Sequence, residues 1–184
     1  MNFKLKKSEF DHFSQLASEW WLKNGKFKDF APLASRVIQE ISSYRCLFVA
    51  MLLHDIAKGK TGDHSVNGSI VASTVCPRLG LSNEETDIVK WLVLNHLLLS
   101  KTAFRYELGD PKTIKDFSEK VKTVEKLQLL LVLTVADIKG VGPDIWNDWK
   151  GSLISDLYLK SLDVLLSCLL YTSDAADDTP CVDL

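Results

Sequence analysis

The stretch that decides the fold is Tyr44-Arg45-Cys46-Leu47-Phe48-Val49-Ala50-Met51-Leu52-Leu53-His54-Asp55-Ile56-Ala57-Lys58-Gly59. Over residues 44–57 its apolar side chains would cover a helix nearly all round, which is typical of a buried central helix. His54 and Asp55 therefore start in an apolar setting, where an unpaired carboxylate is costly to bury. A bound cation would remove that cost.

Helical periodicity extends over most of the chain, because apolar residues recur at intervals of three and four and alternating runs are almost absent. The sequence predicts an all-α fold. Further helices are expected over residues 8–21, 32–42, 65–79, 83–98, 111–121, 124–138 and 144–166, separated by breaks that carry glycine or proline. Ser82 with Glu85, and Thr123 before an apolar run, are typical of helix starts.

Length and composition favour one main globular domain, since the chain has 184 residues, of which 46% are hydrophobic and 25% charged. A net charge of −2 provides no basic field for nucleic acid. No signal-peptide core follows the N-terminus, and no apolar stretch reaches the ~20 residues of a membrane span. The four cysteines, which show no ligand spacing, are interpreted as reduced thiols: Cys46, Cys76, Cys168 and Cys181. We expect a cytoplasmic protein that binds neither nucleic acid nor membrane.

Further metal-type residues accompany the His54-Asp55 pair. His64 follows a loop with two glycines, and His96 and Asp137 lie within two other apolar helical stretches. Imidazole and carboxylate together suit Mn, Fe, Zn or Mg, ions that polarise a phosphoryl oxygen and generate hydroxide near neutral pH. The alternative is that each histidine is a hydrogen-bonded core residue. Several such residues would each need a separate buried partner, so one shared site is favoured.

Several strings resemble the HD domain of the bacterial bifunctional uridylyltransferases/uridylyl-removing enzymes, which act on the PII signalling protein. The resemblance covers residues 45–158, about three fifths of the chain. It rests on Leu52-Leu53-His54-Asp55-Ile56-Ala57-Lys58-Gly59, Gly62-Asp63-His64-Ser65, Trp91-Leu92-Val93 with His96-Leu97-Leu98, Asp110-Pro111 with Thr113-Ile114, Leu133-Thr134-Val135-Ala136-Asp137-Ile138, and Trp146-Asn147-Asp148-Trp149-Lys150.

This resemblance implies a helical bundle of the HD phosphohydrolase type that hydrolyses uridylyl-tyrosine on PII with a divalent metal, Mg or Mn first and Fe or Zn as alternatives. It implies that His54, Asp55 and Asp137 are metal ligands, and that His64 and His96 complete a second metal site or contact phosphate. Lys58 would offer a point charge to the phosphodiester, or else be a solvated lysine at a helix end. These six residues are the candidate catalytic residues.

The chain also departs from the HD pattern, which begins with a further ligand histidine well upstream of the His-Asp pair. No histidine lies between Phe13 and Leu53, and His12 is the only candidate. Residues 6–42, with Trp20-Trp21 and Gly25-Lys26-Phe27-Lys28, resemble the N-terminal arm of the ubiquinone-biosynthesis O-methyltransferase. No glycine-rich turn for S-adenosylmethionine follows, so methyl transfer is not expected. Gly59-Lys60-Thr61 likewise lacks the remainder of a P-loop.

Residues 168–177 resemble a translated sequencing adapter. We therefore expect three segments of different origin, namely a chimeric helical arm (1–43), a partial HD domain (44–167) and a disordered tail (168–184). We also expect the family's nucleotidyltransferase domain to be absent. The expected function is that of a fragment of an HD phosphodiesterase, impaired by loss of the first ligand histidine. The alternatives are a catalytically inactive helical HD module and an HD nucleotidase.

Overall fold

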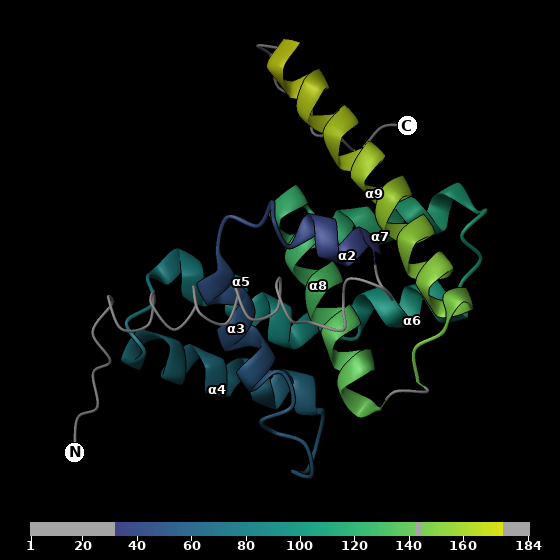
Figure 1. Cartoon of the computed structure of the whole chain (residues 1–184). Coiled ribbons are helices and arrows are strands. Elements are labelled where there is room, and N and C mark those ends of the chain that lie inside the picture. The colour runs from purple at the N-terminus through teal and green to yellow at the C-terminus, as the bar shows by residue number, and fades with distance from the viewer. Residues whose placement is uncertain (1–31, 143–144, 175–184) are drawn as a thin grey trace.

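The computed structural model describes residues 32–142 and 145–174, with side chains through residue 168, and this part of the chain is all-α without a strand (Figure 1). The all-α prediction is confirmed. The helix expected over residues 8–21 lies outside the described residues, as does His12.

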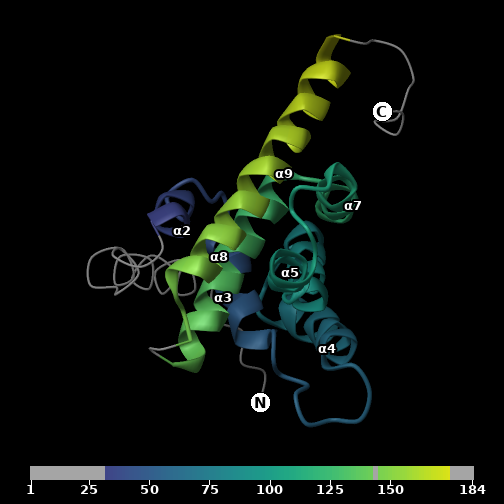
Figure 2. The same cartoon turned by 90° about the vertical axis from the view of Figure 1, so that its right-hand side faces the viewer.

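The centre of the bundle is α8 (Val124–Val141), whose residues Leu129 to Val135 are all buried. Its neighbours are α2 (Pro32–Val37), α3 (Tyr44–Leu53), α5 (Asn83–Asn95), α6 (Leu98–Arg105), α7 (Pro111–Val121) and α9 (Asp148–Asp174). The two views place α8 between α3 on one side and α9 on the other (Figures 1 and 2). We expected the helix over residues 44–57 to be the central one, but in α3 the side chain of Leu52 is 70% exposed. The longer leucine run of α8 offers more apolar surface, so it takes the core position.

A second layer is formed by α4 (His64–Arg78), which lies along α5 on the far side of α3 from α9 (Figure 2). The face of α4 that is buried carries small residues, namely Ser65, Gly68, Ala72 and Cys76. Small side chains let two helices approach closely, so α4 and α5 form the most extensive helix pair of the described fold.

Two predicted helices end earlier than their apolar pattern suggests. Residues 44–57 were expected to be one helix, but α3 ends at Leu53 and the chain continues in tight turns, with Ile56 N–H donating to Leu53 O and Lys58 N–H to Asp55 O. Residues 83–98 were also expected to be one helix, but α5 ends at Asn95 and α6 is a separate, unpredicted helix. Apolar periodicity does not mark such breaks, because buried apolar residues such as Ala57 and Leu99 follow them at helical spacing.

Helix starts follow the expected caps. The capping box of Ser82 and Glu85 is present, and the Thr123 hydroxyl accepts a hydrogen bond from Lys126 N–H. α9 begins at Asp148, four residues later than expected, and continues to Asp174, beyond residue 168 where we expected the tail to begin. The end of the expected N-terminal arm is integrated with the core, since Val37, Ile38 and Ile41 are buried.

Cys46 and Cys76 are buried free thiols, and Cys181 lies outside the described residues. None of the helices in the described ranges combines the length and the apolar character that crossing a membrane requires.

Candidate metal centre

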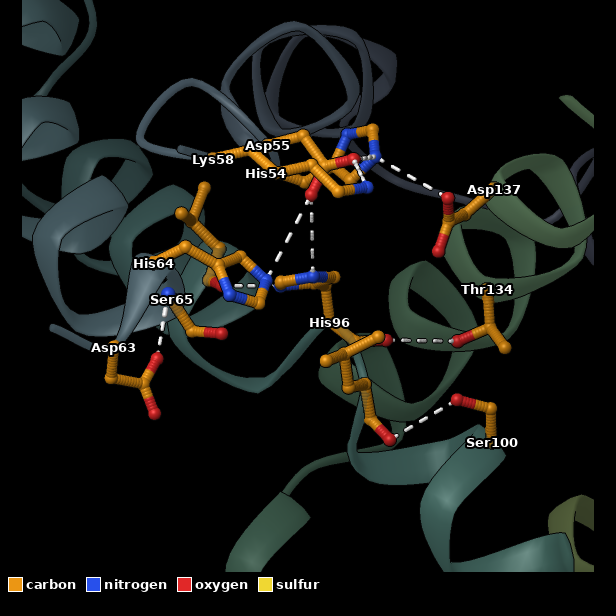
Figure 3. A network of polar contacts seen from close by, with 12 residues as sticks. His54, Asp55, Lys58, Asp63, His64, Ser65, His96, Ser100, Thr134 and Asp137 are labelled. Atoms are coloured by element: carbon orange, nitrogen blue, oxygen red, sulfur yellow. Dashed lines mark hydrogen bonds and ion pairs between the residues drawn. The ribbon is translucent and has the colours of Figure 1, made fainter. Parts of the chain in front are cut away.

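All six candidate residues meet at one end of the bundle, where the end of α3, the start of α4, the end of α5 and the last turns of α8 converge (Figure 3). Their side chains are brought together by helices that are distant in sequence. His54 and Asp55 were expected to be buried, but their side chains are 19% and 32% exposed, because α3 ends just before them. The turn opens this part of the chain to solvent and to a substrate.

Asp55 lies at the middle of the group. Its Oδ1 is 3.9 Å from His64 Nε2 and 4.0 Å from His96 Nε2, and its Oδ2 is 3.5 Å from His54 Nε2. His54 Nε2 in turn lies 3.4 Å from Asp137 Oδ1. Two donor sets result, which we name the α8 triad (His54, Asp55 and Asp137) and the α5 triad (Asp55, His64 and His96). Within each triad the donor atoms lie within 4.8 Å of one another.

The two most interior histidines are oriented by backbone carbonyls of their own helices. His54 Nδ1 is 2.7 Å from Met51 O, and His96 Nδ1 is 2.7 Å from Val93 O. Since a carbonyl only accepts, each Nδ1 carries the proton and donates it. When a ring is neutral, its Nε2 lone pair therefore points into the site, toward carboxylate oxygens. A metal ligand histidine needs this arrangement, in which the other ring nitrogen fixes the tautomer.

These residues fit a divalent cation on two counts. A lone pair facing a carboxylate is repulsive unless a proton or a cation lies between them. The closest donor pairs, at 3.4 to 4.0 Å, are too long for strong hydrogen bonds. They match two atoms that each lie about 2.1 Å from one ion, which are at most about 4.2 Å apart. The reading of three separate core histidines is weaker, because all three rings face the same carboxylate.

The electrostatics of the two triads differ. The contact with Asp137 raises the pKa of His54, although burial opposes this shift. Burial lowers the pKa of His96, and the hydrogen bond to Val93 O only partly compensates. Burial acts to raise the pKa of Asp55, but the hydrogen bond from Lys58 and the nearby His54 outweigh it, so the pKa is lowered. The site therefore holds an ionised carboxylate beside a ring that stays neutral.

Lys58 lies at the rim. Its Nζ is 2.8 Å from Asp55 Oδ2, while its side chain remains 71% exposed. The hydrogen bond to Asp55 raises the pKa of Lys58. The ammonium is thus an exposed positive charge that balances Asp55.

Several groups that hold the site residues in place were not predicted from the sequence. The Met51 and Val93 carbonyls are backbone atoms, for which residue type gives no signal. Thr134 Oγ1 lies 3.5 Å from His96 O and connects α8 to the end of α5. The sequence does mark Thr134, because it carries a single hydroxyl in a leucine-rich stretch, one helical turn before Asp137. Asp63 caps α4 by accepting from Ser65 N–H and Val66 N–H, which fixes the turn from which His64 projects.

The HD domain family model matches residues 16–138, beginning inside the segment 1–43 for which we expected another origin. A bifunctional uridylyltransferase/uridylyl-removing enzyme of Azospirillum brasilense is 54% identical over 144 residues, which is 78% of this chain and 15% of that protein. Its counterpart in Zymomonas mobilis is 49% identical over 151 residues, 82% of this chain and 16% of that protein.

A third relative of the same name, from Rhodospirillum rubrum, is 52% identical over 146 residues, or 79% of this chain and 16% of the relative. The chain thus spans about a sixth of the length of the curated relatives it matches. No solved structure matches it. The resemblance to these enzymes is confirmed, and the matched family model covers most of the bundle that builds the two triads. The chain belongs to the HD domain family.

Proposed function

We propose that this chain carries a divalent-metal phosphodiesterase site of the uridylyl-removing type. The observation that carries the proposal is the pair of triads that share Asp55. It is supported by membership of the HD domain family and by relatives whose name includes the uridylyl-removing activity. The metal we propose is Mg²⁺ or Mn²⁺, with Fe or Zn as alternatives, since imidazole and carboxylate donors serve all four.

In this proposal the α8 triad holds one ion, and His64 and His96 complete a second site with Asp55 or contact the phosphate. A bound metal would polarise a phosphoryl oxygen and lower the pKa of water. The protein keeps the donor atoms ready, because Met51 O and Val93 O hold both Nε2 lone pairs toward the site. His96 stays neutral through burial, so it donates its lone pair without first losing a proton.

Lys58 has a second role in this account. In the metal-free site its ammonium balances the charge of Asp55 at 2.8 Å. A cation held by Asp55 would balance the carboxylate charge in place of Lys58, and the exposed Lys58 ammonium would then be available to a substrate phosphodiester. A lysine contributes a flexible point charge of this kind.

The substrate we propose is uridylyl-tyrosine on a PII-type signalling protein. A bond forms between the water oxygen and phosphorus, and the bond from phosphorus to the tyrosine oxygen breaks. That oxygen takes up a proton, which leaves tyrosine and uridine monophosphate. We further propose that the missing upstream histidine lowers metal affinity and rate, because a site short of one ligand binds its ion less tightly.

The test is metal analysis followed by hydrolysis assays on the whole chain. The purified protein should carry or take up Mg²⁺ or Mn²⁺ and should cleave bis(p-nitrophenyl) phosphate and uridylylated PII, and EDTA should abolish both reactions. Free nucleotides are assayed alongside, and faster cleavage of them would favour a nucleotidase instead. A protein that binds no divalent metal and cleaves none of these substrates would be the non-catalytic helical module.

Lys58→Ala separates substrate binding from metal binding. We expect it to raise KM for the phosphodiester about tenfold, the loss of roughly one charge-assisted contact, while Mn²⁺ affinity is retained. Lys112→Ala, an exposed lysine on α7, is the matched control and should change neither quantity. An unchanged KM in Lys58→Ala would show that Lys58 does not contact the phosphodiester and is a solvated lysine at a helix end.

A further inference from the structure

Gly68 lies one helical turn after His64, on the buried face of α4. A Cβ built at this position would meet Val93 Cγ1 at 2.9 Å, with the carbonyl oxygens of Leu53 and His54 at 3.6 and 3.8 Å. Each of these neighbours belongs to a segment that carries or orients a residue of the metal centre. Leu53 and His54 immediately precede Asp55, and the carbonyl of Val93 orients the His96 ring.

Residues four apart lie on the same face of a helix, so His64 and Gly68 face the same neighbours, α5 and the end of α3. The two rings of His64 and His96 meet edge to face with their centroids 5.3 Å apart. The spacing between α4 and α5 therefore decides how far His64 lies from the other two members of the α5 triad.

We propose that Gly68 is a positioning residue for His64, whose lack of a side chain sets the distance of His64 from Asp55 and His96. A methyl group here would meet Val93 Cγ1 at 2.9 Å, and Val93 is fully buried in a close-packed core that opposes a shift of its side chain. Relief of the contact to an ordinary 3.4 Å moves α4 away by about 0.5 Å or more. His64 Nε2 is already 3.9 Å from Asp55 Oδ1, close to the limit of about 4.2 Å for two ligands of one ion.

No member of the α8 triad lies on α4, and the His54 carbonyl oxygen would lie 3.8 Å from the added Cβ, which is an ordinary van der Waals distance. We therefore expect Gly68→Ala to disturb the distances within the α5 triad and to leave those within the α8 triad unchanged. This inference rests on the proposed metal site, and it is tested with one readout that uses metal and one that does not.

The metal readout is Mn²⁺ binding measured by equilibrium dialysis. Gly68→Ala should weaken binding about tenfold or more, as other changes around a ligand do, and should match His64→Gln measured alongside. The control is Gly140→Ala in α8, where an added Cβ meets nothing within 4 Å, so both variants gain the same helix propensity. Gly140→Ala should bind Mn²⁺ as the unmodified protein does.

The metal-free readout is the nuclear Overhauser effect between the ring protons of His64 and His96, recorded in EDTA. It should be lost or strongly reduced in Gly68→Ala and kept in Gly140→Ala. If the unmodified protein binds no Mn²⁺, the proposed function fails, and this measurement alone then decides the role of Gly68.

If Gly68→Ala does not fold, a second variant that removes the close contact still tests the proposal. Gly68→Ala combined with Val93→Ala removes the clashing Cγ1 atom and should restore the ring contact, with Mn²⁺ affinity within about threefold of the unmodified protein. A folded Gly68→Ala with unchanged Mn²⁺ binding and ring contact would overturn the proposal. So would a folded double variant in which both remain lost.

Discussion

The α8 triad and the α5 triad share Asp55 but lie in different surroundings. In the α8 triad, the side chains of His54 and Asp137 are 19% and 26% exposed, and their mutual contact raises the pKa of His54. In the α5 triad, the His96 side chain is only 2% exposed, and burial lowers its pKa. The pKa is thus raised at His54 in the α8 triad and lowered at His96 in the α5 triad. The same ligand types are tuned by burial in one case and by a carboxylate partner in the other.

Asp55→Asn should have the largest effect, because Asp55 is the only residue common to both triads. The substitution keeps the shape of the side chain but removes the charge. We expect Mn²⁺ affinity to fall by more than about 100-fold, beyond the range seen for groups that only support a ligand. Isothermal titration with Mn²⁺ measures this, with the exposed Asp163→Asn of α9 as the matched control. Residual binding within about tenfold would show that the triads do not depend on a common ligand.

His64→Gln and Asp137→Asn should then separate the two triads. Each removes a ligand from one triad only, so each should weaken binding at that triad about 10-fold to 100-fold and leave binding at the other triad unchanged. Stoichiometry by equilibrium dialysis, combined with the Co²⁺ absorption spectrum, reports which environment is left. Identical spectra for the two variants would contradict the existence of two distinct sites.

The opposite pKa shifts predict a pH signature in metal-free protein. The raised pKa of His54 means that its contact with Asp137 stabilises the fold below the ordinary value of 6.5, and that this contribution is lost as pH rises through the folded-state pKa. The lowered pKa of His96 acts in the other direction, since the fold is penalised as pH falls below 6.5. Asp137→Asn removes the first contribution and leaves the second.

Urea unfolding in EDTA measures this signature. Asp137→Asn should destabilise the protein most at about pH 5.5 and least at about pH 8, and its stability should rise with pH more steeply than that of the unmodified protein. A destabilisation that is independent of pH would show that Asp137 does not interact with a titrating histidine.

Thr134→Val should have the smallest effect. It removes a long hydrogen bond of 3.5 Å from Thr134 to the carbonyl of His96, in a helix that is otherwise held by leucine packing. We expect about 0.5–1.5 kcal/mol of lost stability by thermal unfolding. Mn²⁺ affinity should change by less than about threefold. A larger loss of Mn²⁺ affinity would mean that Thr134, rather than packing alone, holds α8 against the α5 triad.

Much of this fold was predictable from the sequence, because buried helices leave a periodic apolar pattern and caps such as Ser82 and Thr123 mark where they start. The ends were harder to predict. The helical apolar spacing of α3 continues past Leu53 with Ile56 and Ala57, and it does not show that hydrogen bonding there changes to tight turns. That change is what places Asp55 between the histidines.

The composition of the site was predicted, but its geometry was not. Histidine and aspartate in apolar helical stretches indicated four of the six residues that converge. His64 was predicted from its loop with two glycines, and Lys58 from the family resemblance. The orientation of the rings depends on the carbonyls of Met51 and Val93, which any residue would offer. The closeness of α4 depends on Gly68, whose absent side chain is informative only once its neighbours are known.

The central claim is that Asp55 lies between two histidine-containing metal sites, and anomalous diffraction at the manganese edge tests it most directly. Crystals of the full chain grown with MnCl₂ should show an anomalous peak about 2.0–2.3 Å from a carboxylate oxygen of Asp55 and from the Nε2 atom of His54 or His96. A second peak should lie on the other side of the Asp55 carboxylate. Peaks only at exposed carboxylates elsewhere, with none beside Asp55, would contradict the account.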